Sequence, residues 1–411
     1  MYPKLRFKEF SDAWEQRKLE DMASFSKGSG YSKSDLIDSG TPLILYGRLY
    51  TKYETVITEV DTYAEEKKGS VFSKGGEVIV PASGETAEDI SVASVVEKSE
   101  VLLGGDLNVI TPSEVLESMF LALNITYGKA HKDMSKLAQG KSVVHLHNAD
   151  LKTIVLQYPS ILEQRKICEF FKSLDNLITL HQRQCETLKK QKQFFLQNMF
   201  PKEGESSPKI RFKGFSDSWK QCKLHEICSM NARIGWQNLR TSEFLDSGDY
   251  LLITGTDFVN GKVNFKSCHY VDKYRFDQDL KIQVQNGSIL ITKDGTLGKV
   301  AIIEALPKPA TLNAGVFNVV IKSKDIDNYY LYQYLKAPFL MNYVNKRSTG
   351  GTIKHLNQSI LVDFPVLKPS LQEQQKIGAY FERLDNLITL HQRQYEQLVS
   401  LKKYLLTKMF I

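Results

Sequence analysis

The segment Leu174–Gln184, LDNLITLHQRQ, recurs unchanged at Leu384–Gln394, an offset of 210 residues. A second echo joins the beginnings of the two copies, since PKLRFKEFSDAWEQRKL at Pro3–Leu19 matches PKIRFKGFSDSWKQCKL at Pro208–Leu224 in 12 of 17 positions. The 411-residue chain is therefore two copies of one unit. Because the ends of the copies agree while their middles differ, we interpret the unit as one scaffold carrying two different recognition heads.

Each copy contains a long helix whose start is marked in the sequence. Ser160 stands three residues before Glu163, and Ser370 three before Glu373, which is the spacing of a capping box. Downstream, positions repeat in steps of four and three, and this 3.5-residue period predicts coiled-coil pairing. Lys192 and Lys402 fall on this seam, where we expect them to fix register or to snorkel. The other predicted seam residues are Ile167, Phe171, Leu174, Ile178, His181 and Leu188, and Ile377, Phe381, Leu384, Ile388, His391 and Leu398.

The polar linker between the copies, residues 201–207, predicts how the helices run. Seven residues span at most about 25 Å, whereas a helix of some 40 residues is roughly 60 Å long. The second copy should then start near the far end of the first helix, so the helices are expected to be antiparallel, with one head at each end.

The heads have the composition of mixed α/β domains. Short β-rich runs at Glu77–Pro81, Ser288–Thr292 and Val316–Lys322 lie between turn residues, without the regular alternation of a doubly wound fold. The predicted fold class is α/β, with mixed α+β heads joined by two long antiparallel coiled-coil helices in a pseudo-twofold internal repeat. The predicted domains are 1–159 (first head), 160–200 (central spacer helix), 201–207 (linker), 208–369 (second head) and 370–411 (C-terminal spacer helix).

Composition excludes several classes of function. A net charge of +7 favours a polyanionic partner without establishing one. Five cysteines without a CxxC support neither a disulfide framework nor a zinc site. The start has no apolar targeting segment and no run of eighteen apolar residues occurs, so we expect a cytoplasmic protein that does not enter membranes.

Catalytic motifs are missing, and basic, glycine-rich loops remain. Gly140-Lys141-Ser142 lacks the earlier glycine of a phosphate loop, and His145 and His147 lack a third metal ligand in view. Loop side chains in both heads suit phosphates and base edges, because arginine and lysine neutralise phosphates and polar groups pair with bases. The candidate DNA contacts are Arg48, Tyr50, Lys141, Arg233, Gln237, Asn238, Lys293, Thr296, Arg347, Thr349 and Lys354.

Taken together, these motifs resemble the specificity subunit of type I restriction-modification enzymes. The resemblance covers essentially the whole chain. It is carried by the RFKxFSDxW openings (Arg6–Trp14, Arg211–Trp219), the helix starts leading to LDNLITLHQRQ, and KDGTLGK (Lys293–Lys299) and STGGTIKHLN (Ser348–Asn357). The first head departs from the last two motifs, which weakens the transfer of contact residues to it.

The resemblance implies two target-recognition domains, each reading half of a bipartite site in double-stranded DNA. It also implies modification (methyltransferase) subunits docked on the helices, and motor-nuclease restriction subunits in the assembly. S-adenosylmethionine, ATP and Mg²⁺ would belong to those partners, with no cofactor and no catalytic residue on this chain. Exposed helix positions are the expected docking faces: Arg165, Gln182, Arg183, Gln392 and Arg393.

Two alternatives remain open at the level of sequence. One is a stand-alone bipartite DNA-binding regulator, which would bind DNA tightly without partners. The other is an enzyme with an unrecognised active site in one head, which would cleave or methylate DNA unaided.

Overall fold

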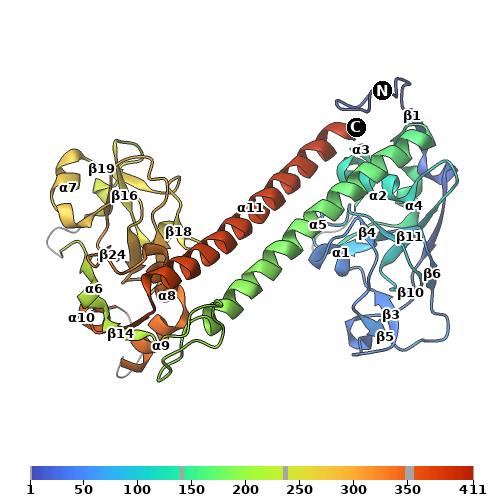
Figure 1. The fold of residues 1–411 in the computed structure, drawn as a ribbon. Coiled ribbons are helices and arrows are strands. Elements are labelled where there is room, and N and C mark those ends of the chain that lie inside the picture. The colour runs from blue at the N-terminus through green and yellow to red at the C-terminus, as the bar shows by residue number, and fades with distance from the viewer. Residues whose placement is uncertain (1, 139–142, 235–238, 348–355, 411) are drawn as a thin grey trace. The chain divides into compact units, whose positions relative to one another are not determined.

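The computed structural model describes residues 2–138, 143–234, 239–347 and 356–410. The chain divides into two compact units, Met1–Gln182 with Arg393–Ile411 (unit 1) and Arg183–Gln392 (unit 2). Each unit contains one head and part of both long helices, α5 (Ile161–Asn198) and α11 (Leu371–Met409) (Figure 1). The units thus divide within the helices rather than at residues 159 and 369, and the predicted domain boundaries stay a prediction.

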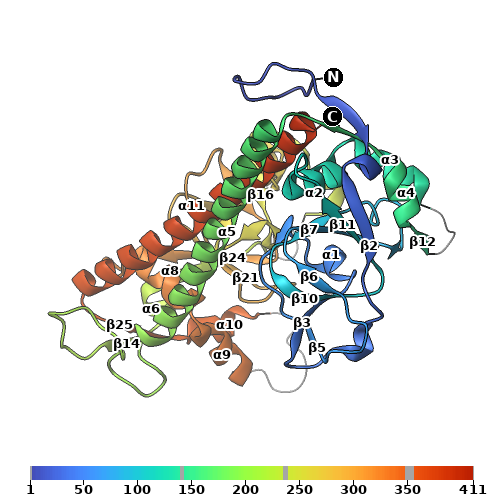
Figure 2. The ribbon, with the colours of Figure 1, turned by 90° about the vertical axis from the view of Figure 1, so that its right-hand side faces the viewer.

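The head of unit 1 contains a five-stranded sheet of order β2-β11-β7-β9-β4 and a four-stranded sheet of order β5-β3-β10-β6. Figure 2 shows this head with several of these strands labelled. Two further strand pairs are β1 with β13 and β8 with β12. The strands are β1 (Glu15–Lys18), β2 (Ala23–Lys27), β3 (Thr41–Ile44), β4 (Val56–Ile57), β5 (Tyr63–Ala64), β6 (Phe72–Lys74), β7 (Glu77–Pro81), β8 (Ser83–Gly84), β9 (Ser94–Val96), β10 (Ser99–Leu103), β11 (Leu107–Pro112), β12 (Val144–His145) and β13 (Val155–Tyr158). Its short helices are α1 (Arg48–Thr51), α2 (Ser118–Tyr127), α3 (Lys129–Leu137) and α4 (Asn148–Thr153).

The head of unit 2 repeats this layout with one strand more in the larger sheet. Its sheets have the orders β15-β24-β21-β22-β18-β17 and β19-β16-β23-β20, and β14 pairs with β25. The strands are β14 (Lys220–Lys223), β15 (Cys228–Asn231), β16 (Tyr250–Ile253), β17 (Phe258–Val259), β18 (Lys262–Val263), β19 (His269–Val271), β20 (Gln283–Val284), β21 (Ile289–Thr292), β22 (Val300–Ile302), β23 (Ala310–Leu312), β24 (Val316–Ile321) and β25 (Pro365–Lys368). Its short helices are α6 (Leu224–Ile227), α7 (Lys273–Asp277), α8 (Asn328–Lys336), α9 (Pro338–Arg347) and α10 (Gln358–Val362).

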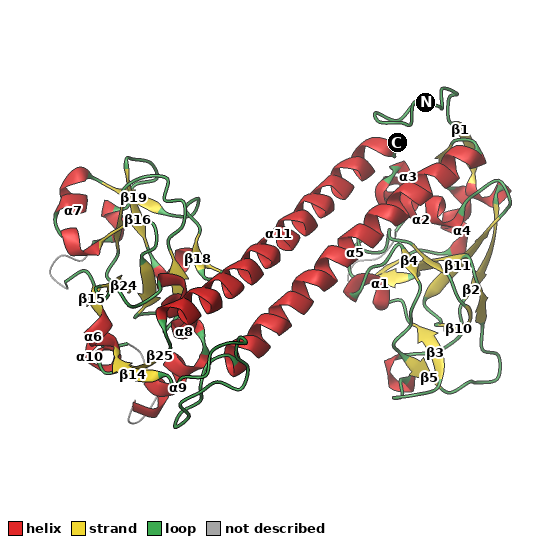
Figure 3. Cartoon of the chain, in the orientation of Figure 1, coloured by secondary structure: helices red, strands yellow, loops and turns green. Residues whose placement is uncertain are grey.

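The predicted β-runs correspond to the central strands of the two larger sheets. β7 is Glu77–Pro81, β21 covers Ile289–Thr292 and β24 covers Val316–Ile321. β7 and β21 are buried at every position, as expected for strands covered on both faces, whose sequences read as continuous apolar runs. The mixed α/β character predicted for the heads is confirmed, and Figure 3 shows strands and short helices mixed within each head.

The two long helices begin one residue after the predicted serine caps. The hydroxyls of Ser160 and Ser370 accept hydrogen bonds of 3.4 Å from the backbone N–H of Glu163 and Glu373. The second half of the predicted capping box is wrong, because the Glu163 carboxylate binds the side chain of Arg6 instead. A tertiary ion pair thus takes the place of the local bond from glutamate to the cap.

Within each unit, the parts of α5 and α11 run antiparallel. In unit 1, the ring centroids of Phe171 and Phe410 are 6.1 Å apart, and Asp175 contacts Lys402. In unit 2, Cys185 contacts Gln392 and Lys192 contacts Asp385. Positions later in α5 therefore meet positions earlier in α11 in both units, which agrees with the predicted direction. The coiled-coil character of the pairing stays a prediction.

Candidate nucleic-acid interface and helix faces

The predicted seam residues fall into two classes of burial. Those near the helix starts, Ile167, Phe171, Leu174, Ile377, Phe381 and Leu384, are buried, whereas Ile178, His181, Leu188, Ile388, His391 and Leu398 are half-buried. The buried class packs into the core of its head as well as beside the other helix: Phe381, for example, stacks on Phe200 with ring centroids 5.9 Å apart. The start of each helix is thus also part of the head that precedes it.

Two ion pairs link the helices at equivalent places in the repeats. Lys192 Nζ lies 2.5 Å from Asp385 Oδ1, and Lys402 Nζ lies 2.5 Å from Asp175 Oδ1. Both residues of one pair are displaced by 210 from those of the other. The unit 2 pair is buried, with side chains 9% and 10% exposed, whereas those of the unit 1 pair are 18% and 34% exposed. The sequence pattern identified the lysines but missed the aspartates, which lie off the apolar seam.

The unit 2 pair also connects the helices to the second head. Asp385 Oδ2 accepts a 2.8 Å hydrogen bond from Gln333 Nε2 in α8. On the same helix, Lys336 Nζ donates to the Tyr332 hydroxyl at 3.0 Å. Burial, followed by repulsion from Lys192, lowers the pKa of Lys336 to about 7. The helix pair of unit 2 therefore carries a buried polar network shared with its head.

The repeated openings bind the helix starts with an equivalent contact in each unit. Arg6 forms two hydrogen bonds with Glu163, of 2.7 and 2.6 Å, and Arg211 forms two with Glu373, of 2.7 and 2.8 Å. The glutamate side chains are 1% exposed. Hydrogen bonding to Glu163 raises the pKa of Arg6 above its ordinary value, and the same holds for Arg211 with Glu373. The RFKxFSDxW motif therefore serves to hold each head on its helix.

In the first head, the structure separates the candidate contact residues. Arg48 is 8% exposed at its side chain and is bound to Glu54, Asp61 and the carbonyl of Glu59, so it is committed within the head. Tyr50 is 37% exposed, and its hydroxyl donates to the Ser83 carbonyl at 2.8 Å. Lys141 lies outside the described residues. Of these three, Tyr50 alone is described as an exposed residue, and we withdraw Arg48 from the proposed DNA contacts.

In the second head, Arg233 is buried rather than placed at the surface. It is 2% exposed, and its guanidinium donates to the Leu312 carbonyl at 3.0 Å and to Thr311 and Gln278. Burial lowers the pKa of Arg233. A charge held there cannot meet a phosphate without unpacking the sheet, and we withdraw it too. Gln237 and Asn238 lie outside the described residues.

The other candidates of the second head come from adjoining elements. Lys293 and Thr296 lie in the β21–β22 hairpin, where Thr296 is exposed and the Lys293 ammonium is 5.7 Å from the centroid of Phe317. This hairpin rests on α9, because a side chain at Gly298 would meet Met341 Sδ at 2.1 Å. Arg347 ends α9, exposed, with its guanidinium 3.8 Å from the Tyr343 ring centroid. Thr349 and Lys354 lie outside the described residues.

The expected docking residues are mostly exposed on the helices. Gln182, Arg183 and Arg393 are exposed, and Arg165 is exposed but lies 3.7 Å from Glu117 of its own head. Gln392 is half-buried and accepts a hydrogen bond from Cys185 Sγ, which places it toward the other helix. Apolar residues that the sequence reasoning passed over accompany the polar ones: Leu177, Leu180 and Leu390 are 45%, 48% and 49% exposed. Their position off the seam in the repeated segment was the signal that could have found them.

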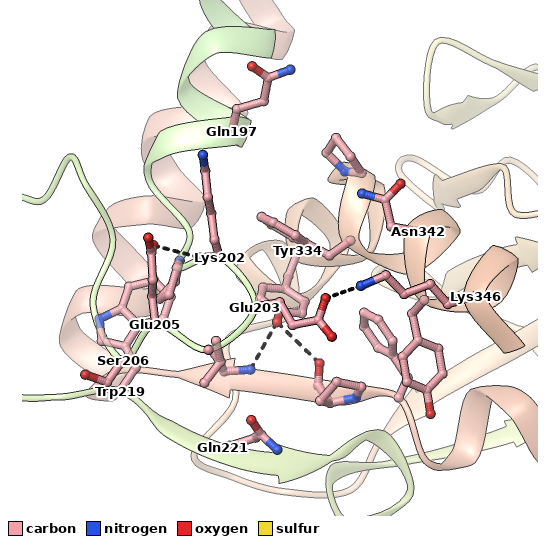
Figure 4. A pocket seen from close by; sticks show the side chains of 18 of the residues that line it. Gln197, Lys202, Glu203, Glu205, Ser206, Trp219, Gln221, Tyr334, Asn342 and Lys346 are labelled. Atoms are coloured by element: carbon pink, nitrogen blue, oxygen red, sulfur yellow. Dashed lines mark hydrogen bonds and ion pairs between the residues drawn. The ribbon is translucent and has the colours of Figure 1, made fainter.

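The linker between the copies is bound to the second head around a cavity of 890 Å³ (Figure 4). Glu203 forms an ion pair with Lys346 of α9, and the Ser206 carbonyl accepts a 2.9 Å hydrogen bond from Trp219 N–H. Aromatic side chains, Tyr334 and Phe339 among them, line the cavity together with Arg347. The predicted linker is therefore part of unit 2 and is packed in part against the second head.

No group of three or more potential metal ligands occurs among the residues that the structure describes. The same residues include no helix long and apolar enough to cross a membrane. The cysteines are free thiols, and burial raises the pKa of Cys168 and of Cys228.

Comparison with known proteins gives a consistent result. The sequence profile of the type I restriction modification DNA specificity domain matches residues 11–190 and again 216–400. The putative type I restriction enzyme MjaX specificity subunit of Methanocaldococcus jannaschii is 23% identical over 98% of this chain and 94% of its own length. The MjaVIII specificity subunit of the same organism is 22% identical over 71% of this chain and 69% of its own length.

Solved structures agree in fold. The type I restriction-modification S subunit from M. genitalium superposes with a TM-score of 0.66 at 16% identity, covering 100% of this chain and 99% of that one. A chain from a structure of type I restriction-modification complex assembly has a TM-score of 0.54, with 98% of both chains covered. With the specificity-domain profile matched once in each repeat, over most of the sequence, the chain belongs to the family of type I restriction-modification DNA specificity proteins.

Proposed function

We propose that the chain is the DNA-recognition subunit of a type I restriction-modification complex, in which each head reads one half of a bipartite site in double-stranded DNA. The observation that supports this most is the combination of a repeated scaffold with unlike head surfaces. The contacts of Arg6 and Arg211, the paired helices and the sheet order recur in both units. The β7–β8 segment of the first head and the β21–β22 hairpin of the second differ in sequence.

The helices would set the separation of the half-sites, because a rigid connection fixes both the distance and the rotation between two DNA-reading elements. The exposed faces of the helices would bind modification subunits. Leu177, Leu180 and Leu390 would form the apolar centres of these contacts. Gln182, Arg183 and Arg393 would form their polar rims. We place S-adenosylmethionine on those partners, and ATP and Mg²⁺ on restriction subunits, in the cytoplasm.

Base discrimination would arise in the heads. From the described residues, we retain Tyr50 in the first head and Lys293, Thr296 and Arg347 in the second as contact candidates. Each good bidentate contact to a base edge discriminates by about 1–3 kcal/mol. A few such contacts in each head, added over two half-sites, are enough to select a rare sequence.

Methylation mapping tests the proposal directly. The chain is co-expressed with its modification subunit in a host that lacks other methylation, and the modified positions are read by single-molecule sequencing. We expect a split motif with a constant gap, and marks without such a motif would refute the proposal. Exchanging the first head for that of another specificity subunit should change one half of the motif and leave the other.

A further inference from the structure

We propose that the first head reads its half-site with a polar platform on one edge, formed by Tyr50, Ser83, His145 and His147. This inference rests on the proposed function and deepens it, because it assigns DNA base edges as the ligand of a specific surface. His145 recurs as His355 in the second repeat, whereas His147 and Ser83 stand where the second repeat has Asn357 and Asp294, so the platform combines a shared histidine with residues particular to the first head.

The platform lies at a position in the first head that has a structural equivalent in the second head. In unit 1, Leu146 N–H donates to the Ala82 carbonyl at 3.0 Å, and in unit 2, Leu356 N–H donates to the Lys293 carbonyl at 2.8 Å. An equivalent backbone hydrogen bond thus joins the segment after β7 to the segment before α4 in the first head, and the segment after β21 to the segment before α10 in the second. The platform is the first head's equivalent of the surface that carries Lys293 and Thr296 in the second.

The strand geometry points both imidazoles outward. From Val143 to His147 the residues alternate between exposed and buried, with Val144 and Leu146 in the core and the two histidines exposed. The imidazole rings lie parallel, with centroids 6.3 Å apart and planes 5° apart. Leu146 is held by a buried hydrogen bond of 2.8 Å from Asn108 Nδ2 to its carbonyl, so the strand that presents the rings is anchored from inside.

Neighbouring side chains fix the platform from the other side. His145 Nδ1 lies 3.2 Å from Ser83 Oγ, in the β8–β12 pair, where His145 is registered with Ser83. The Tyr50 hydroxyl donates to the Ser83 carbonyl, and Gly84 admits the ring, since a Cβ there would meet the Tyr50 oxygen at 3.0 Å. Polar groups already held in one geometry lose little entropy on binding, which favours specificity.

The chemistry of the platform suits base edges rather than the phosphate backbone. Imidazole and hydroxyl groups both donate and accept hydrogen bonds, as the major-groove edges of base pairs require. Acidic residues also stand close: Asp89 and Asp106 both act on the Tyr50 phenol, whose pKa is raised mainly by burial. Carboxylates repel phosphates, but they accept hydrogen bonds from the amino group of cytosine. A phosphate contact is available from Lys27, which is exposed and has no ion pair among the described residues.

Methylation mapping of variants in the complete complex tests this platform. His145→Ala, Ser83→Ala and Tyr50→Phe are compared with Ser99→Ala, an exposed serine of the other sheet in the same head. We expect the three platform variants to relax one or two base positions in one half of the motif, by about 5- to 100-fold in discrimination. The other half should be unchanged, and Ser99→Ala should give the parental motif.

The second half-site serves as the internal control for folding and assembly. Motifs identical to the parental one for all three platform variants would overturn the platform while leaving the proposed function intact. If the parental complex itself gave no split motif, the proposed function would fail first. If His145→Ala abolishes all methylation, the platform is tested with Ser83→Ala and Tyr50→Phe, because each of these substitutions removes a single oxygen atom.

Discussion

Removing one partner from the buried pair of Lys192 and Asp385 should destabilise the protein far more than removing one partner from the equivalent pair, Lys402 and Asp175. Lys192→Met leaves Asp385 buried without its ion-pair partner, with a hydrogen bond from Gln333 and with Lys336 nearby, whose pKa burial lowers to about 7. Removing one partner of a buried pair costs about 3–5 kcal/mol, because the other charge stays uncompensated in a poorly solvated site. Lys402→Met acts at a pair with side chains 18% and 34% exposed, where water screens the charges, and should cost about 0–1 kcal/mol.

Hydrogen exchange measured by mass spectrometry gives the local free energy of opening for α8 and for residues 371–392. Lys192→Met should lower the protection of these segments by about 100-fold or more, since each 1.4 kcal/mol is a factor of about ten. Lys402→Met should change protection in its own unit by less than about tenfold. The double variant Lys192→Met/Asp385→Leu should recover most of the loss, because an apolar pair replaces the stranded charge. Equal effects of the two single variants, or a double variant worse than either, would refute this reasoning.

Three further predictions follow from contacts in the heads and helices. Lys336 has a folded-state pKa of about 7 against 10.5 ordinarily, so the unfolded chain binds the additional proton between these values and the stability of unit 2 should rise with pH from about 7 upward. The free energy of unfolding is measured between pH 7 and 9 for the parental chain and for Lys336→Met, and the difference isolates the contribution of Lys336. An equal pH dependence of the two proteins would contradict the prediction. Gly28→Ala should destabilise the first head, because its Cβ would lie 1.9 Å from the Gly104 carbonyl oxygen, whereas Gly30→Ala, with open space at its Cβ, should stay within about 0.5 kcal/mol in thermal unfolding. Arg6→Met should cost about 3–5 kcal/mol by stranding the buried Glu163, and exchange near the start of α5 should accelerate; unchanged exchange there would show that the opening motif does not hold the head on its helix.

The sequence alone determined the duplication, the starts of both long helices, the strands at Glu77–Pro81 and Val316–Ile321, and membership in a specificity family. These features depend on local periodicity, on serine caps or on repeated sequence segments, all of which can be recognised along the chain. Only the tertiary structure decided which charged groups are available. Arg48 and Arg233 stand in sequence segments of suitable composition, yet their guanidinium groups are bound by partners up to 79 residues away.

The same reason explains the other differences. Glu163 binds Arg6, 157 residues earlier, rather than its own helix cap, and Lys192 meets Asp385, 193 residues later. His145 becomes part of a surface through Ser83, 62 residues before it. Secondary structure follows from neighbours in sequence, but the partner of a charge and the exposure of a side chain follow from which distant segments the fold brings together.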